Sequence, residues 1–456
     1  MTGRVVKLPD RAIPHEAEDW PSSALPPDGV LATLPALQSK STMNKLTFVS
    51  LLTGLANGLA AETKFAPADW PNWRGLTSDG QAPLVDGLPT EWSETKNVVW
   101  KTSIPGKGHG TPTVVGGRIY LATADEEEMF QAVLCIDKNN GKVIWQTKVH
   151  DGQFPIGLNK NASHASTVVV HDGERLYVNF VTGNQAFASA LNLDGKVLWQ
   201  KPIGKYKIHQ GYGSSPMVHR DIVVVKADTK IGGSIVGLDK KTGREIWRQD
   251  RPKIANYTTP VVVEAAGQMQ MVFCGCKLVT SLDPLTGKKL WETPGSTEEC
   301  VSTLVTDGTH VFISGGWPKN HTAAIVADGS GKIAWQNSSR VYVPSMLFRD
   351  GFLYVTMDAG FAVCWNAKTG RQQWKERLGG KFFTSPVMVG NRIYGTNLDG
   401  KTFVFEANPD EYKPIATCQL GDEVYASPVV SGNRIYLRVA FKDSGRREVL
   451  YAIGGQ

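Results

Sequence analysis

The sequence predicts an all-β protein, a single eight-bladed β-propeller of four-stranded antiparallel blades over roughly residues 95–456. The first observation behind this prediction is a repeated pair, a glycine followed four positions later by a tryptophan, which occurs six times. The second is that each repeat holds three or four short apolar runs separated by polar turns. The third is a strand-like segment, 97–101, that is in phase with the last, incomplete repeat.

The glycine–tryptophan pairs set the period of the chain. Their tryptophans are 54, 48, 44, 44 and 39 residues apart, a spacing that indicates a repeat architecture. The glycine supplies the positive φ that a strand-to-strand turn needs. The tryptophan falls in the following strand, where its ring can bury apolar area between neighbouring sheets. The predicted structural tryptophans are Trp100, Trp145, Trp199, Trp247, Trp291, Trp335 and Trp374.

Each repeat has the pattern of an antiparallel meander. In the unit that ends at Trp247, runs at 214–218, 221–226 and 234–239 precede the strand of the tryptophan, and short apolar runs between turns favour strands. Ser/Thr-Pro-like markers start eight units, near residues 111, 166, 215, 259, 302, 344, 385 and 427. The seventh unit lacks its tryptophan, with Ile415 near the expected place.

The eighth unit is one strand short, and segment 97–101 is predicted to supply the missing strand. Such a strand closes the ring and leaves only short, protected sheet edges. A seven-bladed ring is the main alternative, and a linear β-solenoid is a second one.

The N-terminal region is predicted to direct export. Residues 43–61 combine a short basic start, an apolar stretch and a small-residue exit, which is typical of a signal peptide. A buried helix or a membrane anchor is the alternative, although the apolar run is too short to span a bilayer. Residues 1–42 are then a mis-assigned, disordered extension before a true start at Met43, and residues 62–94 form an N-terminal arm. We therefore expect a periplasmic or secreted monomer with no transmembrane segment in the mature chain.

Charge and cysteine content exclude some function classes. The net charge of +6 is small and dispersed, which argues against nucleic acid as a partner. The six cysteines have no metal-like spacing, so most are expected to be buried small hydrophobes, with a Cys276–Cys300 disulfide left open. The sequence contains no nucleophile elbow, P-loop, dinucleotide-binding glycine pattern or zinc motif.

The candidate ligand site is one mouth of the central channel. Positions two residues before the strand-start markers are mostly aromatic or imidazole, and positions four residues before them carry mixed charges. Such a mouth suits a planar ligand, a sugar or a peptide segment. The alternative is that the rings only pack blade against blade. The candidate residues are His109, His164, Tyr257, Tyr342, Phe383, Tyr425, Lys107, Arg340, Lys381 and Glu423.

No catalytic residue or metal ligand is assigned from the sequence. Glu298 and Glu299 are expected in a solvated loop, with calcium binding as the alternative reading. Metal binding or proton transfer is the alternative role for His109 and His164, which are otherwise expected only to line the channel mouth.

The repeats resemble a known family. Residues 238–247 (LDKKTGREIW) and 282–291 (LDPLTGKKLW) are similar to the pyrrolo-quinoline quinone (PQQ) repeat, and residues 364–374 resemble a further copy. The segments 69–75 (DWPNWRG) and 88–92 (LPTEW) resemble the leader of secreted PQQ-like propellers abundant in planctomycete-type bacteria. The resemblance covers about residues 65–456 and implies the propeller fold.

The resemblance also implies three alternatives for function. Quinoprotein alcohol dehydrogenases hold PQQ and calcium in the ring axis, whereas the BamB branch is a non-enzymatic scaffold in outer-membrane assembly. The chain lacks the Cys-Cys dipeptide that is typical of the quinoprotein dehydrogenases. It also lacks the cysteine near the proposed cleavage site that would carry the lipid of the BamB branch. We expect a non-catalytic binding or scaffolding module without a cofactor, whose partner is a protein or a glycan of the cell envelope. The alternatives are a PQQ- and calcium-dependent oxidoreductase and a carbohydrate-binding propeller.

Overall fold

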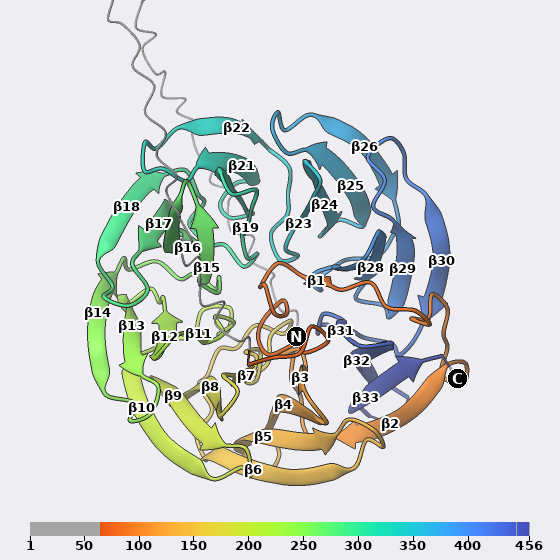
Figure 1. Cartoon of the computed structure of the whole chain (residues 1–456). Helices are drawn as coiled ribbons and strands as arrows, with labels where there is room; N and C mark the ends of the chain where they lie inside the picture. Colours follow the sequence, from red (N-terminus) through yellow and green to blue (C-terminus); the bar gives the residue numbers. More distant parts are fainter. Residues whose placement is uncertain (1–63, 444, 456) are drawn as a thin grey trace, which may run out of the picture. The chain divides into compact units, whose positions relative to one another are not determined.

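The computed structural model describes residues 64–443 and 445–455 and confirms the eight-bladed propeller. All regular structure in this part of the chain is β-strand, and the strands form eight sheets arranged around one axis (Figure 1). The alternatives of seven blades and of a linear solenoid are therefore wrong. The predicted extension 1–42, the signal peptide 43–61 and the start at Met43 lie outside the described residues.

Blades 1 to 4 are four-stranded meanders in chain order. Blade 1 contains β3 (Thr113–Val115), β4 (Arg118–Asp125), β5 (Phe130–Asp137) and β6 (Val143–Asp151). Blade 2 contains β7 (Val170–His171), β8 (Arg175–Thr182), β9 (Gln185–Asn192) and β10 (Val197–Lys205). Blade 3 contains β11 (Met217–His219), β12 (Ile222–Ala227), β13 (Gly233–Asp239) and β14 (Glu245–Arg251). Blade 4 contains β15 (Val261–Ala265), β16 (Gln268–Gly275), β17 (Leu278–Leu282) and β18 (Lys289–Pro294).

Blades 5 to 8 continue the pattern, with two additions from the N-terminal arm. Blade 5 contains β19 (Val305–Thr306), β20 (His310–Gly315), β21 (His321–Val326) and β22 (Ile333–Asn337). Blade 6 contains β23 (Leu347–Arg349), β24 (Phe352–Met357), β25 (Phe361–Asn366) and β26 (Gln372–Arg377). Blade 7 contains β27 (Val387–Val389), β28 (Arg392–Thr396), β29 (Lys401–Glu406) and β30 (Pro414–Gln419), and β1 (Gln81–Ala82) joins it parallel to β27. Blade 8 contains β31 (Val429–Ser431), β32 (Arg434–Phe441), β33 (Arg447–Gly454) and β2 (Val98–Ile104).

Blade 8 closes the ring by pairing the two ends of the propeller. Strand β2 is its outer strand and runs antiparallel to β33, with Val98 opposite Ile453 and Ile104 opposite Glu448. Trp100 and Ile104 of β2 are buried, as are Leu450 and Ile453 of β33. The displaced strand predicted from the sequence is thus the element that removes the last open sheet edge.

The glycine–tryptophan pair acts between blades. The glycines of the six pairs have φ between 69° and 88°, which only glycine adopts without strain. The ring of each tryptophan lies on a turn of the next blade: a Cβ on Gly243 would lie 2.7 Å from Trp199, and one on Gly287 would lie 2.5 Å from Trp247. The Trp199 Nε1 also donates to the Lys240 carbonyl of that turn at 3.1 Å. Glycine is therefore required both for the turn and for the tryptophan packed upon it.

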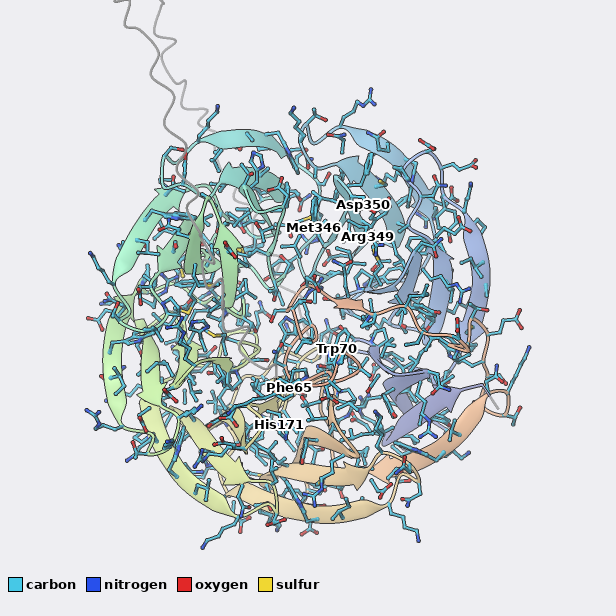
Figure 2. The ribbon with its side chains drawn as sticks, in the orientation of Figure 1. Phe65, Trp70, His171, Met346, Arg349 and Asp350 are labelled. Carbon is cyan, nitrogen blue, oxygen red and sulfur yellow. The ribbon has the colours of Figure 1, made fainter. Side chains whose placement is uncertain are left out.

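The N-terminal arm, residues 64–94 of the described chain, crosses the propeller axis (Figures 1 and 2). Trp70 pairs its backbone with Val114 in blade 1, and the Arg74 guanidinium donates to the Met346 carbonyl beside blade 6 at 2.5 Å. Trp70 and Arg74 are both buried. The arm therefore ties together blades on different sides of the ring.

The arm also compensates for the tryptophan missing from blade 7. The residue at the tryptophan position is Ala416, opposite Val404, as Trp374 is opposite Cys364 in blade 6; Ile415 points outward and is 39% exposed. Trp92 of the arm is buried and stacks on Tyr394 of blade 7 at a centroid distance of 6.3 Å. Tyrosines of other blades contact their own tryptophans at a similar distance with tilted rings, such as Tyr354 and Trp374 at 6.3 Å and 47°.

The six cysteines are all buried and unpaired, so the Cys276–Cys300 disulfide left open by the sequence is not formed in this structure. Among the described residues no helix has the length and apolar character needed to cross a membrane.

We predict that acid destabilises the propeller through His171. This histidine is buried in β7, 5.8 Å from the ring of Phe65 in the arm, and burial lowers its pKa to about 4. In the unfolded chain this histidine takes up its proton near pH 6.5, so between pH 6.5 and 4 the unfolded state binds more protons than the folded state. This difference lowers the free energy of unfolding by at most about 3 kcal/mol. The His171→Gln variant should lose less stability than the wild type between pH 7.5 and 4.5 in urea unfolding. Parallel pH profiles of the two proteins would contradict this role.

Candidate functional site

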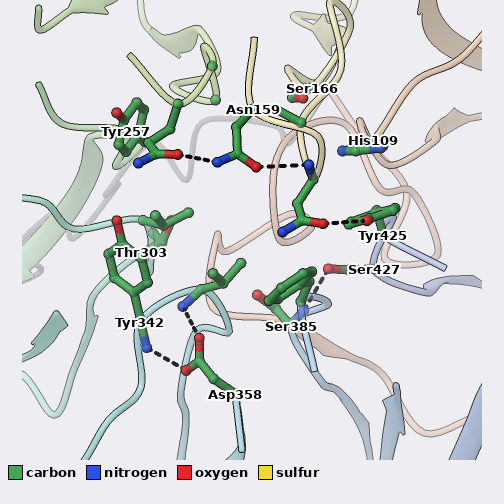
Figure 3. A pocket seen from close by; sticks show the side chains of 18 of the residues that line it. His109, Asn159, Ser166, Tyr257, Thr303, Tyr342, Asp358, Ser385, Tyr425 and Ser427 are labelled. Atoms are coloured by element: carbon green, nitrogen blue, oxygen red, sulfur yellow. Dashed lines mark hydrogen bonds between the residues drawn. The ribbon is translucent and has the colours of Figure 1, made fainter. Parts of the chain in front are cut away.

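A cavity of about 680 Å³ lies on the propeller axis, among the loops that lead into the inner strands (Figure 3). Seven of the ten residues predicted for the channel mouth line it: His109, Tyr257, Arg340, Tyr342, Lys381, Phe383 and Tyr425. The cavity volume is in the range of about 300–1,000 Å³ that is usual for sites of small ligands.

Lys107, His164 and Glu423 are not among the lining residues. The His164 ring stacks on Phe154 at a centroid distance of 4.2 Å, and Lys107 pairs its backbone with Ala124. Glu423 forms ion pairs with Lys442 and Arg446. The side chains of His164 and Glu423 therefore have partners away from the cavity, and Lys107 is held by its backbone.

The misplacement of His164 is a register error in blade 2. The inner strands begin two residues after the hydroxyl-bearing position: Ser215 precedes Met217 and Ser427 precedes Val429. In blade 2 the strand begins at Val170, so the equivalent position is Val168, which carries no hydroxyl. The sequence marker at residue 166 was two residues early, and Ser166, not His164, lines the cavity.

The hydroxyl positions form a hydroxyl belt, a series of hydrogen bonds from blade to blade that runs from blade 2 to blade 4 and from blade 5 to blade 8. The backbone N–H of Ser215 donates to Thr259 Oγ1 at 3.0 Å, and that of Ser385 donates to Ser427 Oγ at 2.8 Å (Figure 3). Val168 lacks the hydroxyl but still donates its N–H to Ser215 Oγ at 3.0 Å. The Ser/Thr markers seen in the sequence are therefore contacts that hold the inner ends of neighbouring blades at a fixed spacing.

Trp73 of the arm forms the inner end of the cavity. Its ring lines the cavity, and its Nε1 donates to Thr303 Oγ1 of the hydroxyl belt at 2.8 Å. The sequence showed this residue only as part of a family-like leader, so its place in the site was missed. The tryptophans in the segment before the first repeat could have indicated that this segment packs against the propeller, because large aromatic side chains are usually buried.

The charges at the cavity are unequal. Asp358 is the one carboxylate among the lining residues, and it accepts backbone N–H groups from Tyr342 at 2.7 Å and Val343 at 3.2 Å. Burial raises the pKa of this carboxyl. Arg340 and Lys381 also line the cavity, and neither forms an ion pair within 4 Å in the described chain. The cavity therefore favours an anion.

His109 Nε2 is a buried polar atom at the cavity that has no hydrogen-bond partner among the described residues, and the buried Tyr257 hydroxyl has only the Gln210 backbone beside it. The His109 ring stacks on Tyr425 with a centroid distance of 3.9 Å (Figure 3). Burial lowers the pKa of His109 well below its usual range and raises that of Tyr257, so both groups are neutral at pH 7. Unpartnered buried polar atoms are rare and call for a partner outside the chain.

Residues of the segment before blade 2 contribute to the cavity lining, and Asn159 lies near Tyr425 across the site (Figure 3). Asn159 Nδ2 donates to Gln210 Oε1 at 2.5 Å, and the Tyr425 hydroxyl donates to Asn161 Oδ1 at 3.3 Å. Both asparagines line the cavity, so its rim carries amide groups that were not predicted from the sequence.

Glu299 differs from its expected place in a solvated loop. Its side chain is 4% exposed and pairs with His209 Nε2 at 3.0 Å, while the Tyr342 hydroxyl donates to its other oxygen at 3.2 Å. The carboxylate thus orients Tyr342 at the cavity wall.

The residues present do not fit a calcium-held quinone. Calcium takes six to eight oxygen ligands, largely carboxylates. Across the described residues no three His, Cys, Asp or Glu side chains gather as a metal site requires, and both oxygens of Asp358 already accept N–H groups. The cavity therefore lacks the ligand set that would hold calcium beside PQQ.

The sequence matches a known family over most of the propeller. The family model described as outer membrane protein assembly factor BamB matches residues 86–210, 130–317 and 319–409. The chain belongs to this family of PQQ-repeat propellers. The BamB of Burkholderia pseudomallei (strain K96243) is 26% identical over 331 residues, which cover 67% of this chain and 77% of that protein.

Solved structures share the fold of this PQQ-repeat propeller. A europium-containing methanol dehydrogenase superposes with a TM-score of 0.64 at 12% identity, covering 86% of this chain and 99% of that one. BamB from Moraxella catarrhalis superposes with a TM-score of 0.55 at 15% identity, covering 77% and 97%. A dehydrogenase and an assembly factor thus share one architecture, so the fold alone does not decide the function.

Proposed function

We propose that this PQQ-repeat propeller is a non-catalytic binding module of the cell envelope that holds its ligand in the central cavity. The observation that carries the proposal is a cavity of about 680 Å³ with aromatic walls and Trp73 at its inner end. A periplasmic or secreted location is supported by the signal-like residues 43–61 and by relatives named as outer membrane protein assembly factors.

The first test is equilibrium titration of the protein with PQQ, with and without Ca²⁺, together with a dye-linked alcohol oxidation assay. We expect no calcium-dependent binding and no dye reduction, because the cavity offers no free set of carboxylates for the metal. Tight, calcium-dependent PQQ binding with alcohol oxidation would show instead a quinoprotein oxidoreductase.

We predict that filling the cavity removes ligand binding without unfolding the protein. Gly213 lines the cavity, and a Cβ at this position would lie in ordinary contact with Tyr257 at 3.8 Å. Gly213→Leu should weaken binding of the aromatic anion 8-anilinonaphthalene-1-sulfonate by about tenfold or more, equal to at least ~1.4 kcal/mol. Dye fluorescence measures the binding, and displacement of the dye then reports candidate ligands.

The matched control is Gly117→Leu. Gly117 lies in the turn between β3 and β4, where an added Cβ meets nothing within 4 Å. Its melting temperature and dye affinity should equal those of the wild type. Dye binding that is unchanged in Gly213→Leu would place the ligand site elsewhere and overturn the proposal.

A further inference from the structure

The charge, hydrogen-bonding groups and rim of the central cavity together indicate the chemistry of its ligand, an inference that rests on the proposed binding function. Lys381 is exposed at the cavity, and its ammonium has no acidic partner within 4 Å in the described chain. Arg340 donates to the Gly316 carbonyl at 3.1 Å and lies over the Tyr342 ring at 5.1 Å. Two cations beside one amide-bound carboxylate, Asp358, complement a ligand carboxylate.

The remaining polar groups suit hydroxyls. His109 Nε2 is buried without a partner, the Tyr257 hydroxyl has only the Gln210 backbone beside it, and Asn159 and Asn161 add amide groups at the rim. A hydroxyl both donates and accepts a hydrogen bond, so it can pair with a phenol, an amide or either tautomer of a neutral imidazole. A purely apolar ligand would leave the buried His109 Nε2 unsatisfied, which costs free energy.

A further aromatic surface lies outside the cavity lining, at Trp317, which follows the Gly316 whose carbonyl accepts from Arg340. Trp317 is 55% exposed, and its carbonyl accepts the N–H of Glu299, whose carboxylate holds Tyr342 at the cavity wall. An exposed tryptophan next to a cavity gives apolar contact area to a ligand that extends beyond the cavity. A chain of sugar units has this extended form and presents both hydroxyls and apolar ring faces.

We propose that the central cavity binds a carboxylate-bearing saccharide, an oligomer of hexuronate units, with a carboxylate at Lys381 and Arg340. The hydroxyls of the same unit pair with Tyr257 and His109, and the next units pass over the rim at Trp317.

The experiment is isothermal titration of the full chain with acidic trimers of galacturonate, mannuronate and glucuronate, each compared with its methyl ester. The ester keeps the sugar and removes the charge. We expect at least one acid to bind about tenfold more tightly than its ester, since a charged hydrogen bond is worth about this factor. Added salt should reduce the difference, because it screens exposed charges.

Two variants locate the charge recognition. Lys381→Met should reduce the preference for the acid over the ester, since Arg340 remains, and leave the affinity for the ester unchanged. Lys332→Met, an exposed lysine in the turn before β22, is the matched control and should keep the preference.

Each remaining outcome contradicts the inference in a definite way. Equal affinity for every acid and its ester, or an unchanged preference in Lys381→Met, overturns it. A glutamate tripeptide that binds as tightly as the best saccharide shows that the cavity selects anionic peptides instead. If Gly213→Leu still weakens dye binding when these saccharide tests fail, the proposed function stands and only this inference is wrong. If Gly213→Leu leaves dye binding unchanged, both the proposed function and this inference are wrong.

Discussion

A chain that begins at residue 105 should fail to fold into a stable propeller. The truncation removes the arm and β2, so it exposes β33, whose residues Val449, Leu450 and Ile453 are buried in the full chain. An unpaired apolar edge strand pairs with other chains and promotes aggregation. We expect loss of the cooperative thermal transition and aggregation in size-exclusion chromatography.

A permuted chain separates the role of strand β2 from that of the arm. In the native protein Val98 is opposite Ile453, and Gly454 donates its N–H to the Asn97 carbonyl at 3.0 Å. Fusing residues 97–104 after residue 455 through a short turn should therefore rebuild β2 as a hairpin with β33. This permutant should regain a cooperative transition, although with a lower melting temperature than the full chain because the arm is absent. A truncation that folds like the full chain would show that the ring does not need β2.

The sequence was sufficient to predict the propeller because each repeat meets the same local constraint. A tryptophan such as Trp247 must lie on the glycine of the next turn, Gly287, so the two residues recur as a pair in blades 1 to 6. Closure of the ring by segment 97–101 was predicted in the same way, because Trp100 keeps the spacing of the other tryptophans. These features depend on neighbouring blades only, so a single chain displays them many times.

The site was harder to predict because its contacts do not repeat. Val168 replaces the hydroxyl that marks the inner strand elsewhere, and this shifted the predicted register of blade 2 onto His164. Trp73 meets Thr303 across 230 residues of sequence, and no period indicates that contact. Asp358 lies in the turn between β24 and β25 rather than before an inner strand, so counting back from the markers could not reach it.

The second large effect is expected at Trp92, the arm residue that stands where blade 7 has Ala416. Its side chain is 4% exposed and stacks on Tyr394, whose hydroxyl donates to the Pro89 carbonyl of the arm at 3.4 Å. Trp92→Ala should lower the free energy of unfolding by about 3–5 kcal/mol, the cost of truncating a large buried aromatic residue. Urea unfolding measures the loss, and Trp247→Ala, which removes an inter-blade tryptophan, should show a similar one.

Two further variants test whether Trp92 substitutes for a blade tryptophan. The Trp92 Nε1 has no hydrogen-bond partner among the described residues, so Trp92→Phe should retain most of the stability. Trp317→Ala, at a ring that is 55% exposed, should change stability by less than about 0.5 kcal/mol. The strand order of blade 8 explains why an arm residue is needed. The outer strand of blade 8, β2, comes from the N-terminal side of the chain, so no turn joins β33 to β2. Blade 8 therefore has no turn glycine on which a tryptophan of blade 7 could pack. A Trp92→Ala protein as stable as Trp317→Ala would mean that the arm only covers blade 7 and does not complete it.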